Sequence, residues 1–391
     1  MFSVAVVCYR NFEYIYDALK SVMSQRGVDI ELIVSDDGSQ DFPCDRIAEY
    51  IKSYKGSNIK NVIIRSEEYN VGTVRHLNHI IDIASGDFIC FLACDDVFAG
   101  DDTLKRYKDG FKKAGAECCI EMAQTAIYDT SLRHLHSYYL RPNIAKLLID
   151  KDYDGLLKQL LIAPCLPTVS TCYKREFFIK YGKFDESYCL IEDLPMHLRI
   201  AAERIDIHYE NFVSIRHRHG GISHGASKAI SETKRRYFRD CLTYVSQSEK
   251  YRLSLSGDFR KRIDSIKSIE KIYYEELLFR RSANIMDKIY FTSRHFVYTI
   301  WTSYVKLARL LPLRYPVKLF ALLIAVMFVL PSAIRSVYLL SGVDLSDLMF
   351  SIYRCLSYML IAMVMLSVIL LPYCFVEKIN TYINKYIYLR A

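Results

Sequence analysis

Two pairs of neighbouring aspartates follow short apolar runs in this chain. The run IELIVS (30–35) leads directly to Asp36 and Asp37, and the run DFICFL (87–92) ends shortly before Asp95 and Asp96. Adjacent carboxylates after a buried strand repel each other unless a cation lies between them and a ligand, and oxygen ligands suit Mg²⁺ or Mn²⁺ that bridges phosphates. Each pair is also compatible with a plain acidic turn at a strand end, so neither decides the chemistry alone.

A third acidic pair, Glu192 and Asp193, opens a predicted helix over 192–203. Acidic side chains at a helix N-terminus are favoured by the helix dipole whatever their purpose. In chemical terms, one of the two carboxylates can take a proton from an acceptor hydroxyl while the other is held by neighbours.

Basic and glycine residues offer contacts for an anion. Gly72 precedes a predicted helix, whose N-terminus favours anions, and Arg75 lies one turn into it. The stretch 216–224 (RHRHGGISH) predicts a flexible basic loop that closes over a diphosphate, with a histidine completing a metal site. The alternative is a basic surface loop, to which His217 and His224 are assigned. Neither a dinucleotide-binding glycine motif nor a Walker loop is present.

Strands and helices alternate around these residues. The alternation predicts a mostly parallel sheet with its ligand site beyond the carboxyl ends of the strands. Residues 104–215 predict further mixed α/β structure, and residues 228–285 predict charged, tyrosine-rich helices without a function of their own. The predicted strands of the first part are 3–9, 30–35, 61–65 and 87–92, and its predicted helices are 13–25, 43–54 and 73–84.

Taken in order, these motifs resemble the family 2 glycosyltransferases, which have a GT-A fold, and among them bacterial enzymes of surface-polysaccharide and lipopolysaccharide assembly. The resemblance covers about residues 1–224. The sequence departs from the family pattern at Cys8, Arg10 and Cys94. The motifs that carry the resemblance are Asp-Asp-Gly-Ser at 36–39, Asn-x-Gly…Arg…Asn at 70–78, the DXD region from Gly86 to Asp96, Glu192-Asp193, and Arg-x-His…Gly-Ile-Ser at 216–223.

The resemblance implies transfer of a sugar from a nucleotide-diphospho-sugar donor, assisted by a divalent metal, Mn²⁺ or Mg²⁺. It implies that Asp193, beside Glu192, is the general base of an inverting reaction. It implies that Asp96 and His219 bind the metal. Donor contacts are implied for Cys8, Tyr9, Asp36, Asp37, Gly72, Arg75, Asp95 and Arg218.

The C-terminal quarter is more apolar than the rest and predicts a membrane-associated helical region. Residues 287–313 mix basic and aromatic residues, as a helix at a membrane interface does. The stretch 355–376 is long enough to span a bilayer, whereas 319–340 carries Pro331 and Arg335 and is compatible with a shorter, tilted or re-entrant segment. Together they predict a membrane hairpin, and basic residues at both flanks put both chain ends in the cytoplasm. A pair of buried core helices is the alternative.

These patterns predict a GT-A domain over 1–225, a helical extension over 226–286 and the membrane region over 287–391. The net charge of +8 suits a phosphorylated substrate or a lipid surface. A nucleic-acid partner is not expected, because the sequence lacks a compact basic block with interleaved aromatic residues. The twelve cysteines include no CxxC pair, which favours reduced thiols, and we expect no signal peptide. We therefore expect a protein of the bacterial inner (cytoplasmic) membrane, with its catalytic domain in the cytoplasm and a lipid-linked or membrane-proximal glycan as acceptor.

Two other functions stay open at this point. A nucleotidyltransferase also uses an α/β sheet with paired aspartates, but the N-terminal run SVAVVCYRN lacks the glycine-rich loop expected of one. A catalytically silent scaffold of a polysaccharide assembly complex would keep the fold without the reaction.

Overall fold

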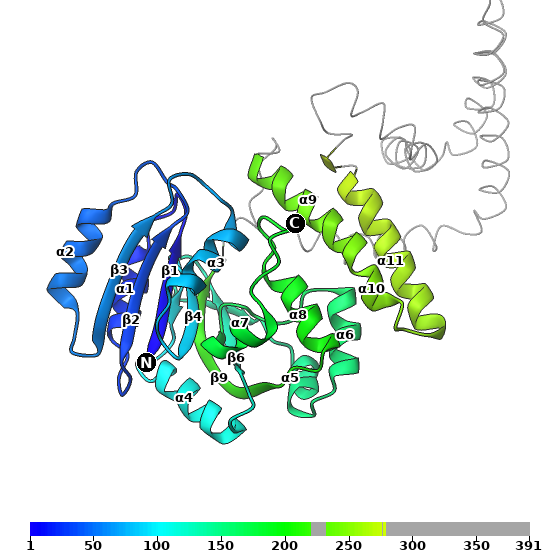
Figure 1. Cartoon of the computed structure of the whole chain (residues 1–391), viewed down its shortest axis with the longest axis horizontal. Helices are drawn as coiled ribbons and strands as arrows, with labels where there is room; N and C mark the ends of the chain where they lie inside the picture. Colours follow the sequence, from blue (N-terminus) through cyan, green and yellow to red (C-terminus); the bar gives the residue numbers. More distant parts are fainter. Residues whose placement is uncertain (220–231, 276, 279–391) are drawn as a thin grey trace, which may run out of the picture. The chain divides into compact units, whose positions relative to one another are not determined.

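The computed structural model describes residues 1–219, 232–275 and 277–278 (Figure 1). They belong to one compact unit, Met1–Leu278. The predicted interfacial helix and membrane hairpin of 287–391 lie outside the described residues, as does the predicted boundary at 225/226. Within the described part, no helix has the length and apolar character needed to cross a membrane.

Four parallel strands form the first half of the sheet, in the order β3-β2-β1-β4. They coincide with the four strands predicted for this part of the sequence. The β-branched apolar residues of β1, β2 and β4 suit strands that are covered on both faces, whereas the edge strand β3 is mostly half-buried or exposed. Their bounds are Phe2–Cys8 for β1, Ile30–Asp36 for β2, Ile59–Ser66 for β3 and Phe88–Ala93 for β4.

The second half of the sheet is mixed, so the prediction of a mostly parallel sheet was wrong beyond β4. The described sheet has nine strands, and its order continues from β4 as β8-β6-β9-β5, with β7 paired to β6. The reason is that β8, a later strand, inserts between β4 and β6 and runs antiparallel to both. The bounds are Val97–Phe98 for β5, Ile120–Tyr128 for β6, Leu135–Tyr138 for β7, Thr171–Lys174 for β8 and Ile207–Arg218 for β9.

Helices cover both faces of this sheet, as alternation along β1 requires. Val4 and Val6 pack into one apolar cluster and Ala5 into the other. The first cluster includes α1 (Ile15–Met23), α2 (Cys44–Tyr54) and α4 (Thr103–Ala114). The second includes α3 (Thr73–Ile83), α5 (Pro142–Ile149), α6 (Tyr153–Ile162), α7 (Arg175–Tyr181) and α8 (Asp193–Ala202).

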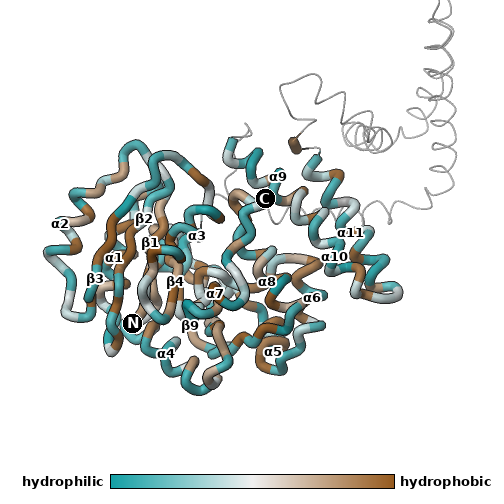
Figure 2. Tube along the Cα trace, in the orientation of Figure 1, coloured by the Kyte–Doolittle hydropathy of each residue, from teal (hydrophilic) through white to brown (hydrophobic). Residues whose placement is uncertain are grey.

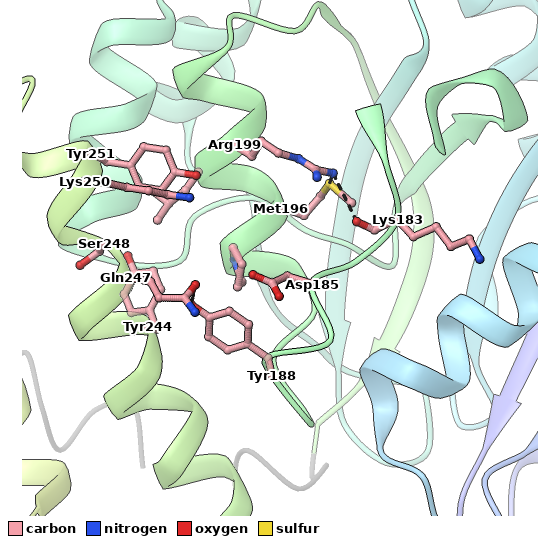
Figure 3. Close-up of a pocket in the computed structure, with 12 residues that line it drawn as sticks. Lys183, Asp185, Tyr188, Met196, Arg199, Tyr244, Gln247, Ser248, Lys250 and Tyr251 are labelled. Atoms are coloured by element: carbon pink, nitrogen blue, oxygen red, sulfur yellow. Dashed lines mark hydrogen bonds between the residues drawn. The ribbon is translucent and has the colours of Figure 1, made fainter. Parts of the chain in front are cut away.

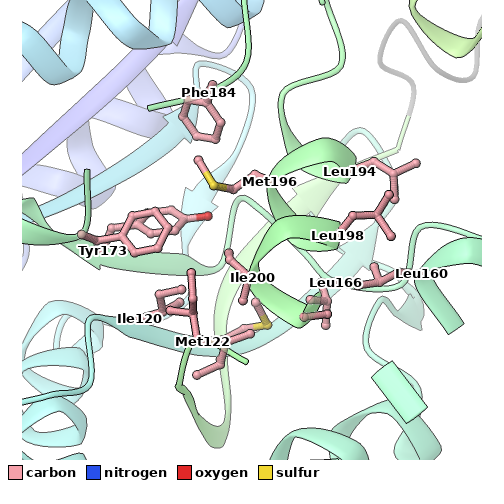
Figure 4. Packing of buried hydrophobic residues seen from close by; sticks show 14 of the residues in the cluster. Ile120, Met122, Leu160, Leu166, Tyr173, Phe184, Leu194, Met196, Leu198 and Ile200 are labelled. Carbon is pink, nitrogen blue, oxygen red and sulfur yellow. The ribbon is translucent and has the colours of Figure 1, made fainter. Parts of the chain in front are cut away.

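The helical extension shares the second cluster. It consists of α9 (Glu232–Gln247), α10 (Glu249–Arg252) and α11 (Gly257–Glu275). Cys241, Tyr244 and Val245 of α9 are buried in the same cluster as α6 and α8. Figure 4 shows side chains of β6, β8, α6 and α8 that meet in this cluster. In Figure 2 the strand β1 is mostly hydrophobic, whereas α11 is largely hydrophilic. The extension is therefore packed onto the α/β domain rather than tethered to it.

Candidate functional site

The first acidic turn begins where β2 ends. Asp36 is fully buried, and its Oδ2 accepts the Ser39 N–H at 2.6 Å and the Ser66 hydroxyl at 2.7 Å. Its Oδ1 accepts the Ser39 hydroxyl at 2.7 Å. In this structure the Asp36 carboxylate therefore shapes the turn, and its contact with a nucleotide stays a prediction.

Asp37 holds a second loop in place. It is 4% exposed, and its carboxylate accepts the Asn70 side-chain amide at 2.7 Å, the Val71 N–H at 2.8 Å and the Gly72 N–H at 3.1 Å. Burial raises the pKa of Asp37 to about 6, and the N–H donors of Val71 and Gly72 offset only part of that rise. Asp37 thus ties the first acidic turn to the N-terminus of α3.

Two glycines permit the close approach of these loops. Gly38 has φ +75°, and a Cβ built on it would lie 2.3 Å from the Tyr69 carbonyl carbon. Gly72 has φ +91°, and a Cβ there would lie 2.5 Å from Cys189 Sγ. Both positions combine a left-handed backbone with no room for a side chain. The loop 69–72 is therefore packed between the first acidic turn and the segment that leads to α8.

The second acidic turn, after β4, is held differently. Asp96 is fully buried, with Oδ2 2.9 Å from His217 Nδ1 and Oδ1 accepting the Arg218 N–H at 3.1 Å. Burial lowers the pKa of His217, but its hydrogen bond to Asp96 and the charges of Asp96 and Asp95 raise it above the ordinary value. Asp95 is partly exposed, and Asn11 donates to its carboxylate at 3.4 Å. Burial and the charge of Asp96 raise the pKa of Asp95.

Arg218 is part of the framework around Asp95. It is 5% exposed, its guanidinium lies 4.0 Å from the centre of the Tyr14 ring, and it pairs with Asp17 at 2.5 Å. Its Nε donates to the Asp95 carbonyl at 2.8 Å, and Nη1 donates to the Thr130 carbonyl. Residues 216–218 pair with β6 as the end of a strand, so the prediction that the basic loop already begins at 216 was wrong. Arg218 holds the backbone of Asp95, and its predicted contact with the donor stays a prediction.

The partly exposed carboxylate of Asp95 fits a divalent metal that is bound together with phosphates, whereas both oxygens of buried Asp96 are already held by His217 and the Arg218 N–H. Mg²⁺ is usually held by one or two carboxylates plus substrate phosphates and water. Within the described residues, no three His, Cys, Asp or Glu side chains are grouped closely enough to hold a metal by themselves. The histidine placed on Asp96 is His217, which the sequence assigned to a surface loop, whereas the ring of His219 lies 5.9 Å from that of His136. His217 is thus a residue that sequence reasoning missed.

Glu192 and Asp193 stand at the N-terminus of α8, as predicted. The Asp193 carboxylate accepts the Leu194 N–H at 2.7 Å. Burial, followed by the charge of Asp193, raises the pKa of Glu192 to about 8. At neutral pH the pair therefore retains one proton and leaves one carboxylate able to accept another.

The other residues predicted to contact the nucleotide-sugar donor differ in burial. Cys8 is buried, and a hydrogen bond with Cys94, followed by burial, raises the pKa of its thiol. Tyr9 is partly exposed, and the Arg10 guanidinium lies 4.9 Å from the centre of its ring. Arg75 is exposed and lies 3.4 Å from the Glu186 carboxylate.

The sequence was compared with the profiles of known protein families. Residues 3–182 match the profile described as glycosyl transferase family 2. This domain belongs to glycosyl transferase family 2. The match contains both acidic turns and the loop at Gly72, and it ends before Glu192 and Asp193.

The chain matches its curated relatives over only part of their length. The chain is 33% identical over 96 residues to the amylovoran biosynthesis glycosyltransferase AmsB of Erwinia amylovora, which is 24% of this chain and 31% of that protein. It is 27% identical over 174 residues to the dTDP-rhamnosyl transferase RfbG of Shigella flexneri, 44% of this chain and 54% of that protein. The chain thus spans about a third to about half of the length of these relatives.

Among solved structures, S. aureus TarS is similar to the chain with a TM-score of 0.46 and 16% identity, over 73% of this chain and 46% of TarS. The predicted GT-A-like α/β fold is confirmed for the family 2 domain, with a mixed sheet in place of a mostly parallel one.

A pocket of about 270 Å³ lies next to helix α8, against α9 and α10 (Figure 3). Tyr188 and Tyr244 line it, together with Arg199, Gln247 and Lys250. All of its lining residues lie beyond the family match, and no sequence motif signalled those of α9 and α10.

Proposed function

We propose that this protein is a glycosyltransferase of bacterial polysaccharide assembly that uses a nucleotide-diphospho-sugar donor. The observation that carries the proposal is a partly exposed Asp95 carboxylate beside buried Asp96 at the carboxyl end of β4, within a domain of glycosyl transferase family 2. Ligands of open α/β sheets bind at that end of the strands.

The proposed chemistry is divided between two acidic pairs, Asp95 with Asp96 and Glu192 with Asp193. Asp95 and Asp96 would hold a divalent metal, which supplies positive charge against the leaving diphosphate when it is bound. His217 and the Arg218 N–H hold the Asp96 carboxylate, and Arg218 holds the backbone of Asp95. Preorganised groups of this kind stabilise developing charge without rearranging during the reaction.

Asp193 is proposed as the general base that takes the proton of the acceptor hydroxyl during an inverting transfer. The Leu194 N–H orients its carboxylate, and burial and the charge of Asp193 raise the pKa of the neighbouring Glu192 to about 8.

The acceptor is proposed to be a lipid-linked or membrane-proximal glycan. The support is the apolar composition of 319–340 and 355–376 and the interfacial composition of 287–313. With this region, the protein is proposed to reside at the bacterial cytoplasmic membrane with its catalytic domain in the cytoplasm. Undiminished transfer to a short water-soluble acceptor after deletion of 287–391 would argue against a lipid-linked acceptor.

Release of nucleoside diphosphate from a panel of nucleotide-sugars, measured with the full-length chain and a polyprenyl-linked glycan extract, tests the proposal. We expect turnover with one donor class and a loss of about 100-fold or more in Asp193→Asn, with nucleotide binding retained. Nucleotide binding without turnover in the wild type would instead support the scaffold alternative, and absence of both would remove the proposal.

A further inference from the structure

Helix α9 lies beyond the family match, yet one of its carboxylates is built into the segment before Glu192. Asp240 is 4% exposed. Its Oδ2 accepts three consecutive backbone N–H groups, those of Cys189 at 2.9 Å, Leu190 at 2.5 Å and Ile191 at 3.1 Å. Hydrogen bonds to a charged acceptor are stronger than neutral ones, and three on one oxygen restrain three successive peptides. Asp240 therefore restrains the backbone that enters the acidic pair of α8.

The preceding turn of α9 reaches the other loop of the site. Arg236 and Asp240 are four residues apart and so share one face of the helix. Arg236 Nη1 donates to Asn70 Oδ1 at 3.0 Å. Asn70 in turn donates its amide to Asp37 Oδ2 at 2.7 Å. One helix face is thus bonded to the loop that Asp37 holds and to the segment before Glu192.

The two restrained segments also touch each other directly. The Val74 N–H donates to the Cys189 carbonyl at 3.1 Å. A Cβ at Gly72 would lie 2.8 Å from the same carbonyl oxygen. Because no space separates them, a shift of residues 189–191 must move the N-terminus of α3 as well.

The end of α9 adds a third attachment beside the pocket of Figure 3. The Tyr188 hydroxyl donates to Gln247 Oε1 at 3.0 Å, and Gln247 Nε2 donates to Ser187 Oγ at 3.1 Å. The helix is therefore bonded along the whole segment from Ser187 to Ile191, over its last two to three turns.

We propose that Asp240 and Arg236 are positioning residues, through which α9 sets the Glu192–Asp193 pair against the loop at Gly72. The effect on turnover rests on the proposed function, whereas the coupling of the two loops does not. The charge of Asp240 also adds to burial and to the charge of Asp193 in raising the pKa of Glu192. A helix of the C-terminal extension thereby becomes part of the candidate site.

Hydrogen–deuterium exchange on the full-length chain tests the coupling without any assay of activity. In Asp240→Ala we expect the amides of 189–191 to exchange about tenfold faster or more, because each loses a bond to a charged acceptor. We expect faster exchange at Val74 too, although it lies on the other loop. Asp264→Ala is the matched control, since Asp264 pairs with Arg252 at 2.9 Å on the same extension and touches neither loop. Unchanged exchange at Val74, or equal changes in the control, overturns the proposal.

Kinetics test the consequence for transfer. We expect Asp240→Ala to lower kcat by about 10- to 100-fold with little change in the donor KM, since a small misplacement of a catalytic group has effects of this size. Asp240→Asn, which keeps an acceptor oxygen, should recover most of the loss. Arg236→Ala, at a half-exposed position, should raise the donor KM more than it lowers kcat.

The two proposals fail in different ways. A wild-type chain that shows no turnover removes the proposed function and leaves the exchange experiment to decide the coupling. A wild-type chain that turns over, with Asp240→Ala and Arg236→Ala kinetically equal to Asp264→Ala, removes the role of α9 alone.

Discussion

The two acidic turns, at the carboxyl ends of the parallel strands β2 and β4, each contain a pair of neighbouring aspartates, but the two pairs differ in burial and in hydrogen-bond donors. In the first, Asp36 and Asp37 are buried, and serine hydroxyls and N–H groups of the chain occupy their oxygens. In the second, Asp96 is similarly buried, but Asp95 is partly exposed and receives one long hydrogen bond from Asn11. The end of a strand therefore predicts where carboxylates gather. The number of donors within reach decides which of them remains available to a ligand.

The largest expected difference between the turns is in stability. Asp36→Ala leaves the Ser39 N–H and two hydroxyls without their acceptor in the core, and should lower the free energy of unfolding by about 4 kcal/mol. Asp95→Ala should stay within about 0.5 kcal/mol of the wild type. Denaturant unfolding of both variants checks this, and equal losses would remove the distinction between the turns.

A second difference lies in the backbone of the first turn. Gly38→Ala should cost about 3 kcal/mol, because a left-handed φ is combined with a Cβ 2.3 Å from the Tyr69 carbonyl carbon. Gly115→Ala is the matched control, since Gly115 has φ +95° with nothing within 4 Å of its Cβ. It should cost about 1 kcal/mol. If the two variants unfold at the same denaturant concentration, the close contact of the turn with residues 69–70 carries no energy.

The pH dependence of stability sharpens the comparison at Asp37. Its pKa is raised to about 6 in the folded protein, chiefly by burial, so the native state binds a proton more tightly than the unfolded chain. The stability that this proton contributes is present below about pH 4 and is lost as the pH rises through 6. Relative to Asp37→Asn, the wild type should therefore lose roughly 2 kcal/mol between pH 4 and pH 7. Unfolding curves at four pH values measure this, and a constant difference would contradict it.

The smallest effect concerns His217 at the second turn. Its pKa is raised overall, since the hydrogen bond and charge of Asp96 outweigh burial, so the stability it contributes is complete below its unfolded pKa and is lost as the pH rises through the folded pKa. His217→Gln should cost about 1 kcal/mol at pH 5.5 and less at pH 8.5. A cost that grows with pH would show that the histidine is not charged when it holds Asp96.

The sequence predicts the parallel half of the fold well. The apolar runs ending at Cys8, Asp36 and Ala93 fall within a residue or two of the observed strands, because fully buried parallel strands are continuous apolar segments. The insertion of β8 between β4 and β6 is not visible in the same way. Strand order depends on pairing between segments far apart in the chain, and Thr171–Lys174 carries no local signal for its neighbours.

The candidate site is predicted in position but not in detail. Sequence places Asp95, Asp96, Glu192 and Asp193 at the ends of elements, where the structure also has them. It could not assign His217 to Asp96, because that contact depends on β9 pairing with β5, the short strand directly after the second turn. The role of Asp240 was equally hidden, since a single acidic residue in a charged helix has no pattern of its own.

Thermal unfolding of the full-length chain with UDP, GDP, dTDP or CMP, each with and without Mn²⁺, tests the central claim most directly. At about a hundred times its dissociation constant, a ligand stabilises the folded state by roughly 2.7 kcal/mol, which is measurable as a shift in Tm. We predict a Mn²⁺-dependent shift for one nucleotide that is lost in Asp95→Asn and kept in Asp193→Asn. No shift from a folded sample, or a full shift in Asp95→Asn, would contradict the assignment of the second acidic turn as the ligand-binding end.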